Sequence, residues 1–182
     1  MNWMVLHESA IHAPLMMCDK HVQNQPREGV QMLVAACLLN GMPPEWMPLT
    51  KTTKKPHKGG YKNHPATRWT SANMGNFAWS WMHTLGLCIE FKKRFGKEHF
   101  ALGQLEHLAT LPWDEYIPAG DMTPFARCFN QSQGENLDLL DEDKYTAVEA
   151  YRMYYMRDKA SFAKWERGTP APHWWKPQEL TA

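Results

Sequence analysis

The chain has 182 residues, of which 43% are hydrophobic, and its 20 basic and 19 acidic residues leave a net charge of +1. This composition excludes a wholly disordered chain, and a chain of this length can fold as one ordinary domain without a disulfide or a metal. Because the net charge is near zero, any attraction to nucleic acid must come from local basic patches.

The four cysteines are far apart in the chain and form no C-x-x-C pair; they are Cys18, Cys37, Cys88 and Cys128. We interpret them as reduced thiols of a cytoplasmic protein. No apolar run reaches the roughly 20 residues needed to cross a bilayer, and the N-terminus lacks a signal-peptide pattern. We therefore expect a soluble chain with no membrane partner.

Hydrophobic spacing predicts an all-α fold, a single compact domain over residues 1–182 with about four main helices and long irregular loops. The Met-rich segment 1–17 is expected to pack on the body as an arm. The first helix is expected from Glu28 to Asn40, with Pro26 in its first turn. Its N-terminal end, where backbone N–H groups are unpaired, would then carry Arg27 and Glu28.

A loop without periodicity separates this helix from the next. It carries five lysines, namely Lys51, Lys54, Lys55, Lys58 and Lys62. Pro65 opens a long helical pattern that ends at Arg94-Phe95-Gly96, with Gly75 and Gly86 as positions where it can kink or split. Further helices are expected at 100–111 and 143–165, followed by an irregular tail at 168–182.

Metal and cofactor sites are not predicted. The nine histidines are scattered, and no H-x-x-x-H or H-E-x-x-H pair occurs among them. Lys58-Gly59-Gly60 lacks the flanking strand and the spacing of a phosphate-binding loop. No elbow motif points to a Ser or Cys nucleophile.

The most polar stretch lies directly before and at the start of the first expected helix, and its ionisable residues are Asp19, Lys20, His21, Arg27 and Glu28. Two interpretations stay open from the residues alone. The stretch can be a solvated helix start in which His21 is an ordinary core or surface side chain. Alternatively, it can carry the chemistry of the protein.

The order Asp-x-His, five residues and then Arg-Glu resembles the pyrimidine-dimer DNA glycosylases of the endonuclease V type, small all-helical enzymes of phages and viruses. The segment Glu90-Phe91-Lys92-Lys93-Arg94-Phe95-Gly96 is similar to the end of that family's middle helix. Residues 151–159 are similar to its Trp-Tyr-Lys-Tyr-Tyr-Gly-Lys run. The chain also resembles, more closely, uncharacterised proteins of phages and large DNA viruses that carry Cys-Asp-Lys-His and Asn-His-Pro, a likeness that implies no activity.

The glycosylase resemblance implies roles for the polar stretch. In that family the residue matching Glu28 is catalytic, and those matching His21 and Arg27 grip the DNA around the lesion. By this likeness Glu28 would stabilise positive charge that develops at the sugar, while His21 and Arg27 would hold phosphate or the opposite strand. Asp19 completes the set of candidate catalytic residues within the motif.

The family's nucleophile is an α-amine that is exposed when the first methionine is removed, and its attack gives an imine that leads to strand cleavage. Here Asn2 is bulky enough that Met1 is expected to stay, so Met1 is the candidate for the amine. Gln31 stands where the family has a second arginine. The predicted strand cleavage therefore has less support than the predicted base excision.

The resemblance and the basic loop together predict DNA contacts. The candidate DNA-binding residues are Lys54, Lys55, Lys58, Lys62, His64, Arg68, Tyr151, Arg152, Tyr155 and Lys159. Each group has a structural alternative. The lysines can form a solvated loop, His64 can simply cap a helix, and at least one tyrosine of Tyr151, Tyr154 and Tyr155 is expected in the core.

The sequence thus predicts a DNA-acting enzyme that cleaves or alters the glycosidic bond of a damaged or modified pyrimidine, without a cofactor. DNA is the expected partner, and the host-cell cytoplasm is the expected location for a phage-encoded protein. Two alternatives remain. One is a non-enzymatic phage protein that binds DNA or a host protein through a Trp-rich surface, and the other is a base-modifying transferase that uses the same carboxylate.

Overall fold

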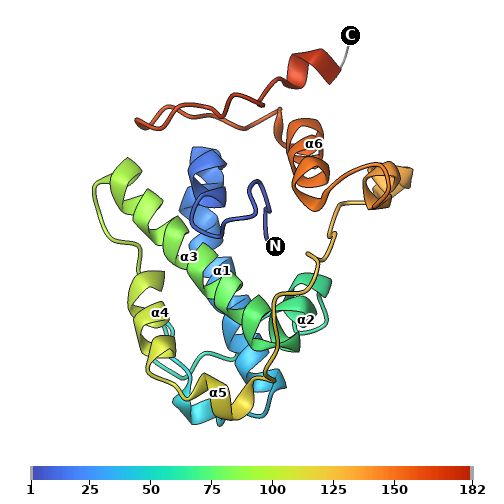
Figure 1. Ribbon diagram of the computed structural model, residues 1–182. Coiled ribbons are helices and arrows are strands. Elements are labelled where there is room, and N and C mark those ends of the chain that lie inside the picture. The colour runs from blue at the N-terminus through green and yellow to red at the C-terminus, as the bar shows by residue number, and fades with distance from the viewer. Residues whose placement is uncertain (1, 181–182) are drawn as a thin grey trace.

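The computed structural model describes residues 2–180 as helices joined by long connections (Figure 1). The α-helices are α1 (Asp19–Leu39), α2 (Pro65–Ala72), α3 (Met74–Phe95), α4 (Ala101–Ala109), α5 (Trp113–Tyr116) and α6 (Ala147–Lys159). Short 3-10 helices lie at Ala13–Met16, Pro44–Trp46, Ser132–Gly134, Leu137–Leu140 and Pro177–Leu180. Residues 2–180 form no sheet, which confirms the all-α prediction. None of the described helices is both long and apolar enough to span a membrane.

The centre of the fold is the pair α1 and α3, which run side by side in opposite directions (Figure 1). Asp19 at the start of α1 forms an ion pair of 3.0 Å with Arg94 near the end of α3. Farther along, a Cβ atom on Gly29 of α1 would lie 2.4 Å from the hydroxyl oxygen of Thr84 on α3. The missing side chain at Gly29 therefore lets the two helices approach closely.

Helix α1 begins at Asp19, not at Glu28 as predicted. Pro26 consequently lies inside the helix, where a proline usually costs about 3 kcal/mol. Tertiary contacts stabilise the early turns, since Val22 is fully buried and the backbone N–H of Asp19 donates a hydrogen bond to the carbonyl of Lys164. Glu28 is therefore in the interior of the helix and not at its open N-terminal end.

The predicted long middle helix is two helices, because the chain is extended at Asn73. The Asn73 side chain accepts a hydrogen bond of 2.9 Å from a backbone N–H three residues on, and so caps α3. The break does not lie at Gly75, which instead admits the backbone of Met122, whose nitrogen would be 2.3 Å from a Cβ atom there. Helix α3 ends after Phe95 at Gly96, which adopts φ 67°, as the stop signal predicts.

Helix α4 lies within the predicted segment 100–111, whereas α6 is shorter than the predicted segment 143–165. It begins after Thr146, whose hydroxyl accepts a hydrogen bond from the backbone N–H of Glu149. The Glu149 carboxylate accepts one from the backbone N–H of Thr146 in return. This capping box fixes the start. After Lys159 the chain returns to the start of α1, where the carbonyl of Lys164 contacts the backbone N–H of Asp19. The basic residues Lys164 and Arg167 therefore lie outside the helix.

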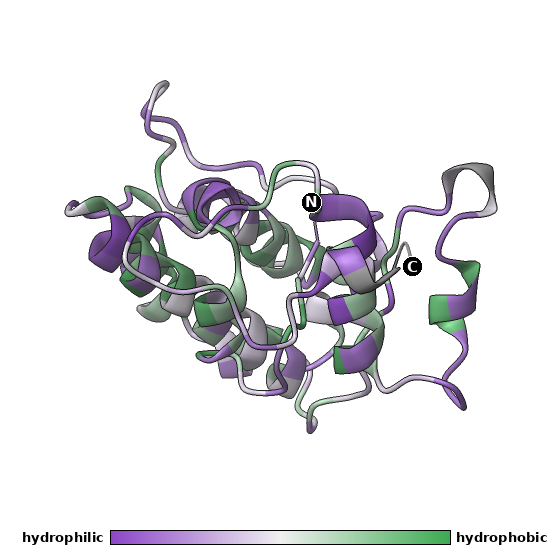
Figure 2. Cartoon of the chain, turned by 90° about the horizontal axis from the view of Figure 1, so that it is seen from above, coloured by the Kyte–Doolittle hydropathy of each residue, from purple (hydrophilic) through white to green (hydrophobic). Residues whose placement is uncertain are grey.

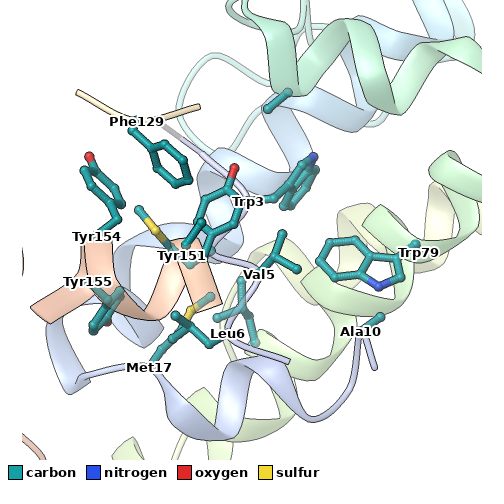
Figure 3. Close-up of a cluster of buried hydrophobic side chains, with 14 of the residues drawn as sticks. Trp3, Val5, Leu6, Ala10, Met17, Trp79, Phe129, Tyr151, Tyr154 and Tyr155 are labelled. Carbon is teal, nitrogen blue, oxygen red and sulfur yellow. The ribbon is translucent and has the colours of Figure 1, made fainter. Parts of the chain in front are cut away.

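The buried hydrophobic side chains form two clusters. The first brings the N-terminal arm against α6 and the early turns of α1, and includes Trp3, Leu6, Met17, Tyr151 and Tyr155 (Figure 3). The second joins the later turns of α1 to α3, α4 and α5. In Figure 2 the hydrophobic stretches gather within the helical part, and most long connections are purple or pale. The arm, described from residue 2, therefore packs on the body as expected.

The tail after α6 contains no α-helix within its described residues, in agreement with the predicted irregular segment. It passes over the later turns of α3, where the hydroxyl of Thr169 donates a hydrogen bond to the buried carboxylate of Glu90. The backbone N–H of Glu166 donates to Asp19 at 2.7 Å. The tail is thus fastened to both central helices.

All four cysteines are free thiols. Burial raises the pKa of Cys37 and of Cys88 to about 12, and that of Cys128 to about 11. Because a thiol must lose its proton to act as a nucleophile, these three groups are poor nucleophiles at neutral pH.

Candidate functional site

An open cleft of about 590 Å³ lies between the first half of α1, the start of α2, the segment 127–131 and the end of α6. Its lining residues are Asn2, Met4, Lys20, His21, Asn24, Gln25, Glu28, His64, Pro65, Arg127, Cys128, Phe129, Asn130, Gln131, Tyr154 and Lys159. Glu28 is the one acidic residue in this lining, and we call the site the Glu28 cleft.

Helix α1 supplies one wall of the cleft. Lys20, His21, Asn24, Gln25 and Glu28 all line it. The pairs Lys20–His21 and Asn24–Gln25 and the residue Glu28 follow one another at intervals of three or four residues, so they lie on one face of the helix. The structure thus brings His21 and Glu28 to the same cleft, and their catalytic roles stay a prediction.

Tyr155 holds the His21 ring in one tautomer. The Tyr155 hydroxyl oxygen lies 2.7 Å from Nδ1 of His21 and accepts a hydrogen bond of 3.0 Å from the backbone N–H of Cys18. We assign the one hydrogen of the hydroxyl to this contact, so that the hydroxyl donates to Nδ1. The hydrogen of the neutral imidazole is therefore on Nε2, and His21 offers an N–H donor.

His21 carries no charge at neutral pH. Burial lowers its pKa to about 3, with further lowering from the positive charges of Lys159 and Lys20. The ring also packs edge-on against Phe162, at 5.5 Å between ring centroids. Because of this environment, His21 acts in the cleft as an uncharged donor, not as an imidazolium ion.

His64 both caps α2 and lines the Glu28 cleft. Its Nδ1 atom accepts a hydrogen bond of 3.2 Å from the backbone N–H of Ala66. The neutral ring must therefore carry its hydrogen on Nε2. Partial burial lowers the pKa of His64. The cleft thus has a second uncharged imidazole with the same tautomer as His21.

Two ammonium groups stand in the cleft with the Glu28 carboxylate. Nζ of Lys159 lies 3.3 Å from the hydroxyl of Tyr154 and 4.7 Å from the centroid of its ring. Nζ of Lys20 lies 4.4 Å from the centroid of Phe162. These contacts with aromatic rings position the cations. With two ammonium groups against one carboxylate, the cleft favours an anionic ligand.

Arg127 also lines the cleft, but its guanidinium has a structural task. It donates hydrogen bonds to the backbone carbonyls of Leu139, Asp141 and Tyr145. These bonds fasten the connection before α6 to the segment 127–131. Arg127 therefore shapes the wall of the cleft, and its guanidinium N–H groups are already used by the protein and do not form a phosphate site.

Gln25 is the most buried polar residue that α1 contributes to the cleft, with 6% of its surface exposed. Its Oε1 atom is buried and has no hydrogen-bond partner among residues 2–180. A buried carbonyl oxygen without a donor costs free energy. A ligand that brings an N–H group to this wall would recover that cost.

Asp19, a candidate catalytic residue, lies outside the lining of the Glu28 cleft and acts as a structural ion-pair partner. Arg94 pairs with Asp19 and with the buried Glu90, and it donates hydrogen bonds to the backbone carbonyls of Met17 and Leu15. This arrangement fixes the end of the N-terminal arm. The carboxylate of Asp19 thus has structural partners away from the cleft, and its catalytic role stays a prediction.

Other predicted residues also lie apart from the cleft. Arg27 is exposed outside the lining, contrary to the expectation that it converges with His21 and Glu28. The same holds for the exposed basic residues Lys54, Lys55, Lys58, Lys62 and Arg68. After the basic loop, the chain first contributes to the cleft lining at His64.

The aromatic run of α6 packs in the core. Tyr151 and Tyr155 are fully buried and Tyr154 is 6% exposed, so the expected stacking of Tyr151 and Tyr155 on DNA bases is wrong for this conformation. Arg152 donates a hydrogen bond to the carbonyl of Leu6 at 3.0 Å and holds the arm. Of the predicted contacts on this helix, Lys159 alone lines the cleft.

Met1 lies outside the described residues. Asn2, the next residue, is buried and lines the Glu28 cleft. Its amide donates to the carbonyl of Cys128, and its Oδ1 atom accepts a hydrogen bond of 3.2 Å from Tyr151.

Sequence reasoning missed the polar residues Lys20, Asn24, Gln25, Asn130 and Gln131 of the cleft. Three of them follow from helical spacing once α1 is extended back to Asp19. The other two lie in an irregular segment that Arg127 positions, and no sequence pattern indicates that.

No family model, no curated protein and no solved structure matches this chain. Among residues 2–180, no group of three His, Cys, Asp or Glu side chains is placed to hold a metal ion.

Proposed function

We propose that the chain is a DNA-acting enzyme similar to the pyrimidine-dimer DNA glycosylases, which cleaves or alters the glycosidic bond of a damaged or modified pyrimidine. The observation that carries the proposal is the placement of Glu28 in an open cleft beside the uncharged His21 ring and the ammonium groups of Lys20 and Lys159. A carboxylate among donors and cations suits a substrate that joins a sugar to phosphate.

The chemistry follows from these groups. The bond between the sugar C1′ atom and the base nitrogen breaks, and its electron pair leaves with the base. The Glu28 carboxylate stabilises the positive charge that develops on the sugar. The Nε2–H groups of His21 and His64 donate hydrogen bonds to oxygen atoms of the departing base or of phosphate. Water or an amine then forms the new bond at C1′ and loses a proton, which the Glu28 carboxylate takes up and passes to the nitrogen of the departed base.

Gln25 gives the cleft a contact for a base that carries an N–H donor, as thymine and cytosine do. Gln25 lines the cleft, and its buried Oε1 atom has no donor among residues 2–180. The ring N–H of thymine, or the amino group of cytosine, supplies such a donor. Reaching this wall requires that the nucleotide leave the base stack, as other enzymes that act on bases require.

The α-amine of Met1 is the proposed nucleophile for the strand-cleaving version of the reaction, because an amine with a pKa near 8 is partly neutral at physiological pH. The placement of Asn2 at the cleft wall supports it. Borohydride in the presence of substrate should trap a protein–DNA adduct that disappears when residues are added ahead of Met1. Base excision without any adduct would assign the attack to water.

Incubation with ultraviolet-irradiated, undamaged and modified-base DNA tests the proposal. Release of free base, measured by chromatography, should be abolished in Glu28→Gln while DNA binding is kept. Glu45→Gln, a change at an exposed carboxylate outside the cleft, is the matched control and should leave release unchanged. Equal release from the wild type and Glu28→Gln would remove the proposal.

The alternative of a non-enzymatic protein with a Trp-rich surface has little support. Trp46 is the one tryptophan exposed in the described chain, at 39%, while the others are buried or partly buried. Surfaces that bind protein partners usually expose several large aromatic side chains, and a single exposed tryptophan does not make such a surface. A base-modifying transferase remains the second candidate, because Glu28 and the two imidazoles suit it equally, and product analysis in the same assay distinguishes it.

A further inference from the structure

A second cleft, of about 620 Å³, lies on the other flank of α1. Its walls come from α1, from the turn between α3 and α4, and from the first turns of α4. We call it the Phe100 cleft, because Phe100 lies in its wall with 37% of its surface exposed. Asn24 lines both this cleft and the Glu28 cleft, so the two meet across one residue of α1.

A third cleft, of about 340 Å³, continues the same path. It shares Lys51, Phe100 and Gly103 with the Phe100 cleft, and its wall also includes Lys54. Each cleft thus shares lining residues with the next, in order from Glu28, over Asn24, to the loop that carries Lys51 and Lys54, and we call this series of clefts the track.

The Phe100 cleft contains an aromatic platform. The rings of His99 and Phe100 are stacked, with centroids 4.9 Å apart and planes 30° apart. His99 in turn packs edge-on against the buried Phe91 at 4.8 Å. One face of the Phe100 ring is thus packed on His99, which itself packs on Phe91. Nζ of Lys51 lies 5.3 Å from the centroid of the Phe100 ring and ends a long side chain that can move aside.

Cations surround this platform. Lys51 and Lys97 both line the cleft. Of the two carboxylates in the lining, Glu98 is already paired with Lys92 at 2.8 Å. Glu106 is the remaining acidic residue. The balance of charge in this cleft is therefore positive.

We propose that the track binds the strand of nucleic acid that flanks the target nucleotide, with one base stacked on Phe100 and its phosphates held by Lys51 and Lys97. A basic groove with an aromatic platform is the arrangement by which proteins bind single strands without sequence preference. This inference rests on the proposed function for the identity of the target.

Binding of labelled oligothymidylate, measured by fluorescence anisotropy, tests the track. An oligomer of about 12 nucleotides should bind far more tightly than thymidine monophosphate, which fills one cleft only. Phe100→Ala should weaken oligomer binding by about 5- to 100-fold, and Phe100→Trp should preserve it. Neither change should affect the affinity for thymidine monophosphate.

A double change, Lys51→Gln with Lys97→Gln, should reduce the slope of log affinity against log salt by about 1.4, the value for two lost phosphate contacts on a single strand. Lys58→Gln with Lys62→Gln is the matched control, because these exposed lysines follow in the same basic loop but line none of the three clefts. An equal loss in both pairs would mean general attraction to basic charge and would overturn the track.

The outcomes separate this inference from the proposed function. Base release that depends on Glu28, together with oligomer binding that is insensitive to Phe100 in both variants, would overturn the track and keep the enzyme. Oligomer binding that depends on Phe100, with no base released from any DNA, would keep the track and remove the glycosylase proposal.

Discussion

The hydroxyl of Tyr155 lies 2.7 Å from Nδ1 of His21, and this contact links the buried face of α6 to the Glu28 cleft. The same hydroxyl oxygen accepts a hydrogen bond from the backbone N–H of Cys18, directly before α1. One buried tyrosine thus fixes the start of a helix and the tautomer of a histidine in the cleft. The aromatic run of α6 therefore acts on the candidate site from within the core.

Tyr155→Phe tests this link. Without the hydroxyl, Nδ1 of His21 loses its donor and the Cys18 N–H loses its acceptor, so we expect stability to fall by about 1–3 kcal/mol. The Nε2–H tautomer should also lose its preference, which long-range nitrogen–proton NMR spectra of His21 would reveal. Turnover should fall in proportion, if His21 donates through Nε2.

Tyr151→Phe is the control for that variant. Tyr151 is equally buried on the same helix, and its hydroxyl contacts Asn2, the Ala126 carbonyl and the Cys128 N–H instead of His21. We expect a comparable loss of stability with an unchanged His21 tautomer. A tautomer that stays the same in Tyr155→Phe would show that another group sets it.

The ion pairs of Arg94 should matter for stability and not for catalysis. Arg94→Met leaves the carboxylate of Glu90 buried, at 1% exposure, without its guanidinium, and we expect a loss of about 3–5 kcal/mol. Asp19→Asn should cost less, about 1 kcal/mol, because its amide oxygen can still accept from Arg94. Urea denaturation measures both. Loss of turnover in Asp19→Asn at unchanged stability would instead return Asp19 to the catalytic set.

Sequence reasoning predicted the all-helical class and the end of α3. It also placed His21 and Glu28 together in one polar stretch. It failed at the start of α1, because helix propensity penalises Pro26 while burial of Val22 outweighs that penalty. The penalty of a proline depends on local sequence, whereas the stabilising contacts come from α3 and the tail, which are distant in sequence. Extending α1 backwards is what places Lys20 and Gln25 on the face of Glu28.

The role of each charged residue was harder to predict than its presence. Asp19 and Arg27 are both within the same polar stretch as His21, yet neither of them lines the Glu28 cleft. Helical geometry separates them once the helix register is known, because neighbours in sequence diverge by about 100° per residue. The register itself depends on where α1 begins, so one boundary error misplaced both side chains.

Gly29→Ala tests the close approach of α1 and α3. The added Cβ atom would lie 2.4 Å from the Thr84 hydroxyl oxygen and 2.8 Å from its methyl group, so we expect a loss of about 1–3 kcal/mol. Thr84→Ala in the same chain should recover part of it in a double-mutant cycle. Gly103→Ala, in open space on α4, should stabilise by up to about 1 kcal/mol. Thermal unfolding that ranks the two alanine variants in the opposite order would contradict this packing.

The buried histidine of α3 predicts how stability depends on pH. His83 is fully buried and stacks on Trp79 at 5.0 Å, and burial lowers its pKa to about 3. In the unfolded chain its pKa is about 6.5, so between these two values the unfolded state binds more protons than the folded state. The free energy of unfolding should therefore fall as the pH decreases from 6.5 toward 3, by up to about 1.4 kcal/mol per pH unit for this group. His21 adds to the effect in the same direction.

Urea denaturation of the wild type and of His83→Phe across this pH range measures the contribution of His83. The phenylalanine cannot be protonated and keeps the stacking on Trp79, so the free energy of unfolding should decline less steeply on acidification. Thr84→Ser, a change beside His83 that adds or removes no titratable group in this range, should keep the wild-type slope. If His83→Phe keeps that slope too, the ring must accept its proton inside the folded chain, and the apolar packing against Trp3 and Trp79 would not control its charge.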